Sequence, residues 1–542
     1  VLTAEQMKAV YQNHEVANHT YSHKPLFLME GQTAQDSKGG TLKGVSLETA
    51  VDEVEKGRQW IFDNLGVAVQ GLAWPNGTPD KRTDYTELKN VVQSGHFYTR
   101  WKESGAFALP ENWLEWDSTC HHRSMPQYTE RFLSMENGGA LQCYFVWGHA
   151  YEFEQSGAAM NWEEMEKQLQ RLAEQEIWKA SNGEIYTYCI AVGMLKQEGN
   201  TLKNLSERAL YAYVNGQKVC IPAGETWQYG LDIGRPSIGC WGDSLTYGQG
   251  ATEQANAYPE TLAKLSGCPV YNMGVPGETA MTIAARQGAV EIVLPEAFTI
   301  PRVGSVEIPL ADVVMDGKTV YYLPTEEDGK VIPRNTAFGD WNPVTICGVK
   351  GMLTVEVNST VWPRMLNRVR FTRAQAGNEV QVKAGERLLC PAQEVEADIN
   401  VFFTGTNGGW SVDNTVAEDS PAAAAKLAEL LRRQIAKTPH SEQYIVVGLI
   451  GGAEGDWKDT EQTLHAAFGE HYLDVKSYLA SEQALSDAGV APTEQDRADI
   501  AVGRIPTCLR TDSVHLNDVG YKLLAQEIYK KLVVLKYIEN KI

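Results

Sequence analysis

The sequence predicts a multidomain α/β protein in which one α/β domain is interrupted by a β-rich insertion. With 542 residues, the chain is longer than one hydrophobic core normally serves. Helical periodicity alternates with short apolar runs in both the first and the last third of the chain. Between them, residues 288–398 carry many β-branched residues and repeated Asp-Gly turn signals without a long helical period, as in an inserted β domain.

The amino-terminal segment, residues 1–199, has the rhythm of an α/β layer or barrel. A helical pattern covers 46–64, and the apolar run 142–147 is expected to form a strand. The first helix is expected to begin after Thr3, with Gln6 completing a capping box.

A small β connector is expected over residues 200–235. Two alternating stretches there flank Asn215-Gly216, the strongest short-range signal for a hairpin. The second α/β domain is expected to cover 236–287 and 399–542, because strand and helix patterns resume after the insertion.

Composition excludes two classes of partner. The formal charge of -21 and a pI near 5.1 repel phosphate backbones, so nucleic acid is not expected to bind. No apolar run is long enough to span a bilayer, so a membrane partner is not expected either. The nine scattered cysteines indicate reduced thiols and slightly favour the cytoplasm over secretion. An oligomer and a signal peptide upstream both stay open.

Ser244 is the predicted nucleophile of a serine esterase. It lies in the run G-D-S-L at 242–245, just after a predicted strand, where α/β proteins place ligands. A serine hydroxyl needs a base to take its proton and an acid to orient that base. The pattern D-x-x-H in the loop before the last helix supplies both, with His515 as base and Asp512 as orienting acid.

Three donors are expected to form the oxyanion hole. The backbone N–H groups of Ser244 and Gly274 follow predicted strands, and Asn407 offers a side-chain amide in the run G-T-N-G-G. The four runs, in this order, resemble the SGNH/GDSL hydrolase family. That resemblance implies a flavodoxin-like α/β/α domain and ester hydrolysis without a cofactor. The chain departs from the family after Asn407, where Gly408 replaces the usual Asp.

A second constellation lies in the amino-terminal segment. His19 and His23 are four residues apart, a spacing that allows both to bind one Zn²⁺ or similar ion. The surrounding run 15–25 closely resembles the second motif of the NodB-like polysaccharide deacetylases, which have a distorted (β/α) barrel. Further matches to that family lie at 72–77, 98–100 and 146–149.

This second resemblance implies roles for four residues. His19 and His23 would hold the metal weakly, Arg100 would help to orient the site, and His149 would be the general acid. The first motif of the family, an acidic pair that supplies the base and a third ligand, is not found in this sequence. A domain that is poor in metal and inactive as a deacetylase is therefore expected.

The leading functional hypothesis is a serine esterase that removes O-acetyl groups from carbohydrate. A lipase or lysophospholipase is the alternative enzyme. A glycan-binding protein with an accessory esterase is the third hypothesis, in which Trp341 and Trp362 of the insertion bind polysaccharide. For both residues, β-domain packing or an inter-domain or dimer contact is favoured instead. Core packing is likewise favoured over sugar stacking for Trp113, Trp116 and Trp147.

Overall fold

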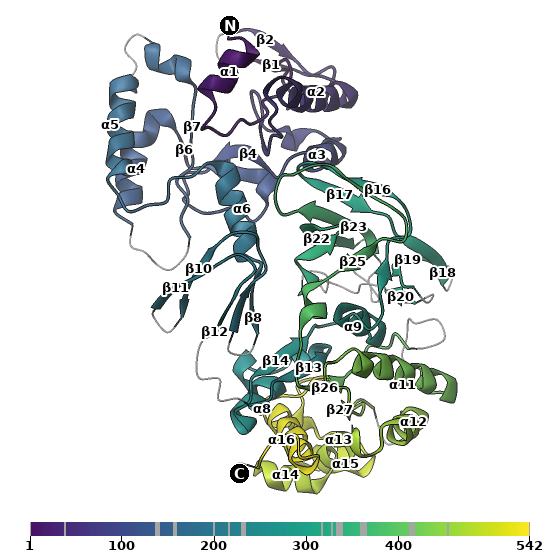
Figure 1. Cartoon of the computed structure of the whole chain (residues 1–542). Coiled ribbons are helices and arrows are strands. Elements are labelled where there is room, and N and C mark those ends of the chain that lie inside the picture. The colour runs from purple at the N-terminus through teal and green to yellow at the C-terminus, as the bar shows by residue number, and fades with distance from the viewer. Residues whose placement is uncertain are drawn as a thin grey trace. The chain divides into compact units, whose positions relative to one another are not determined.

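The structure is a computed structural model, and it divides into two compact units that are described separately (Figure 1). The smaller unit comprises Val1–Ile190, Thr299–Val306 and Arg373–Val380, and the larger unit comprises the other residues. The residues described are 2–36, 39–135, 141–155, 160–198, 201–214, 217–228, 235–315, 318–326, 329–331, 340–357, 366–410, 418–452 and 455–540.

A five-stranded parallel sheet forms the centre of the larger unit. Its spatial order is β14-β13-β26-β27-β28. Counted along the chain this order is 2-1-3-4-5, the flavodoxin-like doubly wound order, which confirms the predicted flavodoxin-like sheet. The strands are β13 (Ile238–Gly242), β14 (Val270–Gly274), β26 (Ile399–Phe403), β27 (Tyr444–Val447) and β28 (Tyr472–Leu473).

Two apolar cores cover the two faces of this sheet. Alternate residues of β13 point to opposite sides, so Cys240 joins one core and Trp241 joins the other. The helices that contribute to the first core are α8 (Tyr258–Ser266), α13 (Val475–Leu479), α14 (Glu482–Ala488) and α16 (Asp518–Val534). The second core receives α9 (Ala280–Gln287), α11 (Pro421–Ala436) and α12 (Lys458–Phe468).

The region predicted as a β insertion is rich in strands. A six-stranded sheet has the order β15-β25-β21-β22-β23-β17, namely Ile292–Val293, Arg387–Leu389, Val344–Ile346, Val349–Val357, Leu366–Arg373 and Ser305–Ile308. A second sheet contains β18 (Ala311–Met315), β19 (Lys318–Pro324) and β20 (Lys330–Val331), and β16 (Phe298–Ile300) pairs with β24 (Val380–Val382). Because two pieces of the region belong to the smaller unit, an independent 288–398 domain stays a prediction.

The connector contains the predicted hairpin. Strands β10 (Leu210–Val214) and β11 (Gln217–Ile221) are antiparallel, and Val214 pairs with Gln217. The turn residues Asn215 and Gly216 lie outside the described residues. A neighbouring antiparallel sheet has the order β12-β9-β8, from Thr226–Gln228, Thr201–Asn204 and Leu195–Glu198.

The smaller unit contains short parallel strands next to helices. Sheet β3-β4-β5 consists of Gly71–Ala73, Tyr98–Glu103 and Trp116–Ser118, and β6 (Cys120–His121) pairs in parallel with β7 (Val146–Trp147). The helices are α1 (Ala4–Val10), α2 (Leu47–Leu65), α3 (Tyr85–Gln93), α4 (Met125–Leu133), α5 (Trp162–Ala173) and α6 (Asn182–Val192), the last of which ends in the larger unit. Closure of these strands into a barrel stays a prediction.

Two local predictions for the smaller unit have different outcomes. Thr3 caps α1 and its box with Gln6 is present, as the sequence predicts. The strand expected over 142–147 is wrong for its first part, since only Val146–Trp147 form β7. Cys143 is nonetheless buried, because it packs in an aromatic core from an irregular segment.

All nine cysteines are free thiols. Within the described residues, no helix is long and apolar enough to cross a membrane.

Candidate active sites

Ser244 is held at a sharp turn between β13 and α7 (Ser244–Tyr247). Asp243 caps this short helix, and its Oδ1 accepts a hydrogen bond of 3.0 Å from the Leu245 N–H. The turn requires glycine at position 242, because a Cβ there would lie 2.4 Å from the carbonyl oxygen of Phe403. Ser244 is consequently fixed at the carboxyl end of the central strand, where the sequence places it.

The predicted triad residues are brought together. His515 Nε2 lies 2.9 Å from Ser244 Oγ, and His515 Nδ1 lies 2.8 Å from Asp512 Oδ2. The other oxygen of Asp512 accepts hydrogen bonds from the N–H groups of Val514 and His515 at 2.7 and 2.8 Å. Partial burial alone would raise the Asp512 pKa, but these hydrogen bonds outweigh it and hold the pKa at about 2. Asp512 is therefore ionised near neutral pH and can stabilise a protonated His515.

The predicted oxyanion donors lie at the ends of neighbouring strands. Ser244 is the first residue of α7, where backbone N–H groups have no partner inside the helix. Asn407 follows β26, and one N–H of its amide donates to the carbonyl oxygen of Glu278 at 2.9 Å, which anchors the side chain. The Gly274 N–H donates to Asn272 Oδ1 at 3.0 Å, so an oxyanion would have to share this donor with Asn272.

A buried hydrogen-bond network, which no sequence motif indicates, holds the residue that anchors Asn407. Glu278 receives hydrogen bonds from Arg286 Nε and Nη2 and from Trp341 Nε1 at 2.7–3.0 Å. Arg286 also donates to the carbonyl oxygen of Met273 at 2.7 Å. The Glu278 and Arg286 side chains are 0% and 2% exposed, so the pair is fully removed from water.

Trp341 is part of this network rather than a surface platform. It is 2% exposed, so the hypothesis that it binds polysaccharide is wrong, and the alternative of a buried contact between the predicted insertion and the predicted α/β domain holds. Its indole is buried because the N–H has a carboxylate partner inside the protein. Trp362 lies outside the described residues.

Replacing Glu278 with alanine is expected to lower the free energy of unfolding by about 3–5 kcal/mol, because Arg286 would remain buried without a counter-charge. Urea denaturation of the full chain measures this change. Glu429→Ala is the matched control: its ion pair with Arg432 is more than half exposed, and about 0–1 kcal/mol is expected. Equal effects of the two substitutions would contradict the role of burial.

The raised pKa of the buried Asp243 carboxyl predicts that the stability of the fold depends on pH. Burial, opposed by the hydrogen bond from Leu245, raises the pKa of its carboxyl to about 7. The folded state therefore binds a proton that the unfolded state releases near pH 4, so stability falls as the pH rises through 7. Between pH 5 and pH 8 the expected loss is about 2–3 kcal/mol.

Asp243→Asn is expected to abolish this loss, since it keeps the capping oxygen and removes the charge. Urea denaturation at both pH values measures it. Asp518→Asn is the control, because hydrogen bonds from Thr252 lower the Asp518 pKa and its charge does not change in this range. A pH slope that survives in Asp243→Asn would refute the assignment.

The residues implied by the deacetylase resemblance also gather in one place. The ring centres of His19 and His23 are 4.8 Å apart. Burial is the main cause that lowers the His19 pKa, and the nearby charges of Arg100 and His149 lower it further. The Arg100 guanidinium lies 4.3 Å from the centre of the Trp147 ring. The sequence matches thus converge on one site in the smaller unit.

The backbone at the histidine pair is unusual. Thr20 and His23 have positive φ values of 67° and 59°, which are rare for residues with a Cβ and most costly for a β-branched threonine. His19 Nδ1 lies 2.7 Å from the Ala73 carbonyl oxygen, and His23 Nδ1 lies 3.4 Å from Asn76 Nδ2, so each ring is oriented by a partner. Both Nε2 atoms are left as ligand candidates.

The histidine pair does not by itself make a tight metal site. Tight catalytic zinc sites have three protein ligands. Within the described residues, three ligand-type side chains lie close together at His121, His122 and Glu152. Neither His19 nor His23 belongs to such a group of three. The residues present therefore do not complete the site that the resemblance implies, and the expected lack of a deacetylase metal there stays a prediction.

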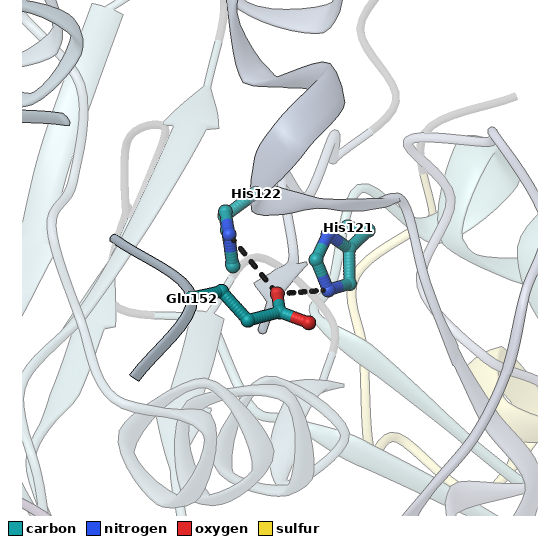
Figure 2. A group of neighbouring side chains, drawn as sticks. All are labelled: His121, His122 and Glu152. Atoms are coloured by element: carbon teal, nitrogen blue, oxygen red, sulfur yellow. Dashed lines mark ion pairs between the residues drawn. The ribbon is translucent and has the colours of Figure 1, made fainter. Parts of the chain in front are cut away.

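The cluster His121–His122–Glu152 was missed by sequence reasoning (Figure 2). The adjacent histidines were a visible signal, but no spacing links them to Glu152, thirty residues later. The parallel pairing of β6 with β7, which sets His121 opposite Trp147, brings the two segments together.

Comparisons with known proteins find one family model that matches part of the chain. Residues 3–93 match the polysaccharide deacetylase family. Among solved structures, the chain is similar to a protein described as lipolytic and of the G-D-S-L family from Desulfitobacterium hafniense DCB-2, with 11% identity, a TM-score of 0.26, and 55% of this chain and 100% of that chain covered. No curated protein matches the chain.

Two further solved structures are similar. One is a carbohydrate esterase family 2 enzyme with a carbohydrate-binding domain from Corynascus thermopiles (Myceliophthora fergusii), with 10% identity, a TM-score of 0.28, and 58% and 70% of the two chains covered. The other is a GDSL-like lipase from Bacteroides ovatus ATCC 8483, with 12% identity, a TM-score of 0.24, and 68% and 95% covered.

Proposed function

We propose that this protein is a serine esterase that removes O-acetyl groups from carbohydrate. One observation carries the proposal: His515 lies within hydrogen-bond distance of both the Ser244 hydroxyl and the Asp512 carboxylate. This arrangement activates a serine for attack on an acyl carbon, whatever the fold that carries it. The carbohydrate class is supported by the deacetylase family match of residues 3–93 in the same chain.

The reaction would proceed in two halves. In the first, Ser244 Oγ attacks the ester carbonyl while His515 Nε2 takes its proton, and the sugar hydroxyl leaves with that proton. In the second, His515 activates a water, which attacks the acetyl-serine and releases acetate. In both halves the oxyanion would be stabilised by the Ser244 N–H and the Asn407 amide, with the Gly274 N–H as a shared donor.

The triad acid Asp512 and the oxyanion donor Asn407 would assist both halves of the reaction. Asp512 stays ionised because of its low pKa, so it favours the protonated imidazole that forms in each half. Asn407 is held by the Glu278 carbonyl, so its amide needs little reorganisation as charge develops. We propose the amino-terminal domain to be inactive as a deacetylase in this chain, since among the described residues no third ligand joins its histidine pair and the family's acidic motif is not found in the sequence.

Acetate release from acetylated xylan, mannan, pectin and chitin oligomers tests the reaction and the substrate class together. The full chain is compared with Ser244→Ala on each substrate. Release from one or more O-acetylated glycans by the parent alone is expected. A preference for long-chain acyl esters over acetyl esters would instead establish the lipase alternative. Acetate released from N-acetylated chitin by both proteins would refute an inactive amino-terminal domain.

A further inference from the structure

The group shown in Figure 2 brings three potential metal-ligating atoms close together. His121 Nε2 lies 3.0 Å from Glu152 Oε2, and His122 Nε2 lies 3.2 Å from the same oxygen. Each of the three residues offers a ligand atom within 4.8 Å of the other two. All three belong to the smaller unit, in which His121 ends β6 and Glu152 lies in the short helix Ala150–Glu154.

The buried atoms of this group have no hydrogen-bond partner. His122 is 2% exposed, yet within the described part of the chain neither of its ring nitrogens is hydrogen-bonded. The same holds for Glu152 Oε2, whose side chain is 10% exposed. Burying polar groups without a hydrogen-bond partner destabilises a fold. The histidines and the glutamate therefore lie within ion-pair distance of one another without forming hydrogen bonds, which points to a further partner.

A transition-metal ion has the chemistry of that partner. In a tetrahedral zinc site the bonds are about 2.0–2.2 Å long, so neighbouring ligand atoms are about 3.3 Å apart. The two nitrogen–oxygen separations of 3.0 and 3.2 Å match this spacing. Imidazole nitrogens suit Zn²⁺ and its neighbours, whereas Mg²⁺ and Ca²⁺ prefer oxygen ligands.

Neighbouring residues orient the ligands. Glu152 turns its other oxygen, Oε1, to Arg123 at 2.9 Å and to His149 Nδ1 at 3.5 Å, which leaves Oε2 for a metal. The His122 ring lies against the backbone of Gly148, where an added Cβ would lie 1.7 Å from His122 Nδ1. Glycine at position 148 is thus required for His122 to occupy this place.

One contact must change for ligation. The Arg123 N–H lies 3.3 Å from His121 Nδ1, near the long limit of a hydrogen bond. A neutral imidazole that binds a metal through Nε2 carries its proton on Nδ1. Binding would therefore move the His121 proton to Nδ1 and open this weak contact.

We propose that His121 Nε2, His122 Nε2 and Glu152 Oε2 bind one divalent transition-metal ion of the Zn²⁺ type, with its fourth position left to water. Its ligands differ from the His19–His23 pair that the deacetylase resemblance indicates, and His149 neighbours both groups. The site does not depend on the proposed esterase activity, since all its ligands lie in the smaller unit.

The test uses the full chain, stripped with a chelator and titrated with Zn²⁺ alone, with stoichiometry measured by elemental analysis after dialysis. The ligand variants are His122→Ala and the conservative Glu152→Gln. Gly148→Ala is added because it displaces the His122 ring without removing a ligand. A variant with both His19→Ala and His23→Ala, and the surface variant His440→Ala, are the controls. Circular dichroism of every variant reports folding, and Co²⁺ replaces Zn²⁺ for a spectrum of the coordination geometry.

One Zn²⁺ per chain and a tetrahedral Co²⁺ spectrum are expected in the parent and in both controls. The ligand variants are expected to weaken Zn²⁺ binding by at least about 100-fold. Excess Mg²⁺ is expected not to compete. The proposal is overturned if the parent binds no Zn²⁺, if folded Glu152→Gln binds it as tightly as the parent does, or if binding is lost only in the His19/His23 variant.

Discussion

Ser244→Ala and His515→Ala are each expected to lower kcat for an activated acetyl ester by about 10⁶-fold, and the double variant is expected to be no slower than either one. Serine and histidine act as one unit, because the hydroxyl is not a nucleophile without the base and the base has no proton to take without the hydroxyl. The distance of 2.9 Å between His515 Nε2 and Ser244 Oγ is the structural reason for this expectation. Steady-state kinetics of the three variants measure it.

Two matched substitutions serve as controls. Ser266→Ala removes another buried serine hydroxyl, which donates to the Leu262 carbonyl oxygen at the end of α8. His440→Ala removes an exposed histidine. Both are expected to keep the parent's kcat. Turnover above about one tenth of the parent's in Ser244→Ala would remove the basis of the proposed esterase, and additive effects in the double variant would argue against a coupled pair.

The residues of the candidate esterase site could be listed from the sequence because they lie in local motifs that a regular fold joins. The turn after β13 and the pattern D-x-x-H are each set by a few consecutive residues. Parallel pairing of β14, β13 and β26 then brings Gly274, Ser244 and Asn407 to the same edge of the sheet. The hydrogen bond between the Gly274 N–H and Asn272 could not be read, because it depends on how the Asn272 side chain turns back at the end of β14.

The buried polar groups could not be predicted, for a different reason. Glu278 and Arg286 are charged residues on an apparently ordinary turn and helix, and their burial depends on Trp341, which comes from a distant segment. Likewise, His122 and Glu152 meet only because β6 pairs with β7. Such contacts follow from tertiary packing, which the periodicity of one segment does not contain.

In the apolar run at 142–147 the sequence predicts a strand that forms only at Val146–Trp147. Its hydrophobicity correctly indicates burial for Cys143, but burial in this segment comes from packing against an aromatic core, with the Cys143 N–H bonded to the carbonyl oxygen of Phe107. Short apolar runs report that a segment is buried, and do not distinguish a sheet strand from an irregular segment.

Asp512→Asn is the second substitution expected to have a large effect, a loss of about 10⁴-fold in kcat with little change in KM. The asparagine oxygen can still accept the N–H groups of Val514 and His515, which fixes its amide nitrogen toward His515 Nδ1. That nitrogen donates, so His515 would carry its proton on Nε2, facing Ser244. In this tautomer the imidazole cannot take the serine proton, although every residue stays in place.

The low pKa of Asp512 leads to a second, independent prediction, about how stability and kcat depend on pH. Because the pKa of about 2 in the folded state lies below the ordinary value near 4, the ionised group stabilises the fold above pH 4, and this contribution is lost as the pH falls through 2. The acid limb of the kcat profile between pH 4 and pH 8 should therefore not reflect protonation of Asp512.

Asp474→Asn is the control for the Asp512→Asn substitution. Asp474 is an exposed helix cap that accepts the Ser477 N–H, and its substitution is expected to keep full activity. If Asp512→Asn kept more than about one tenth of the parent's kcat, Asp512 would be a loop cap, and the orientation of His515 would have to come from elsewhere.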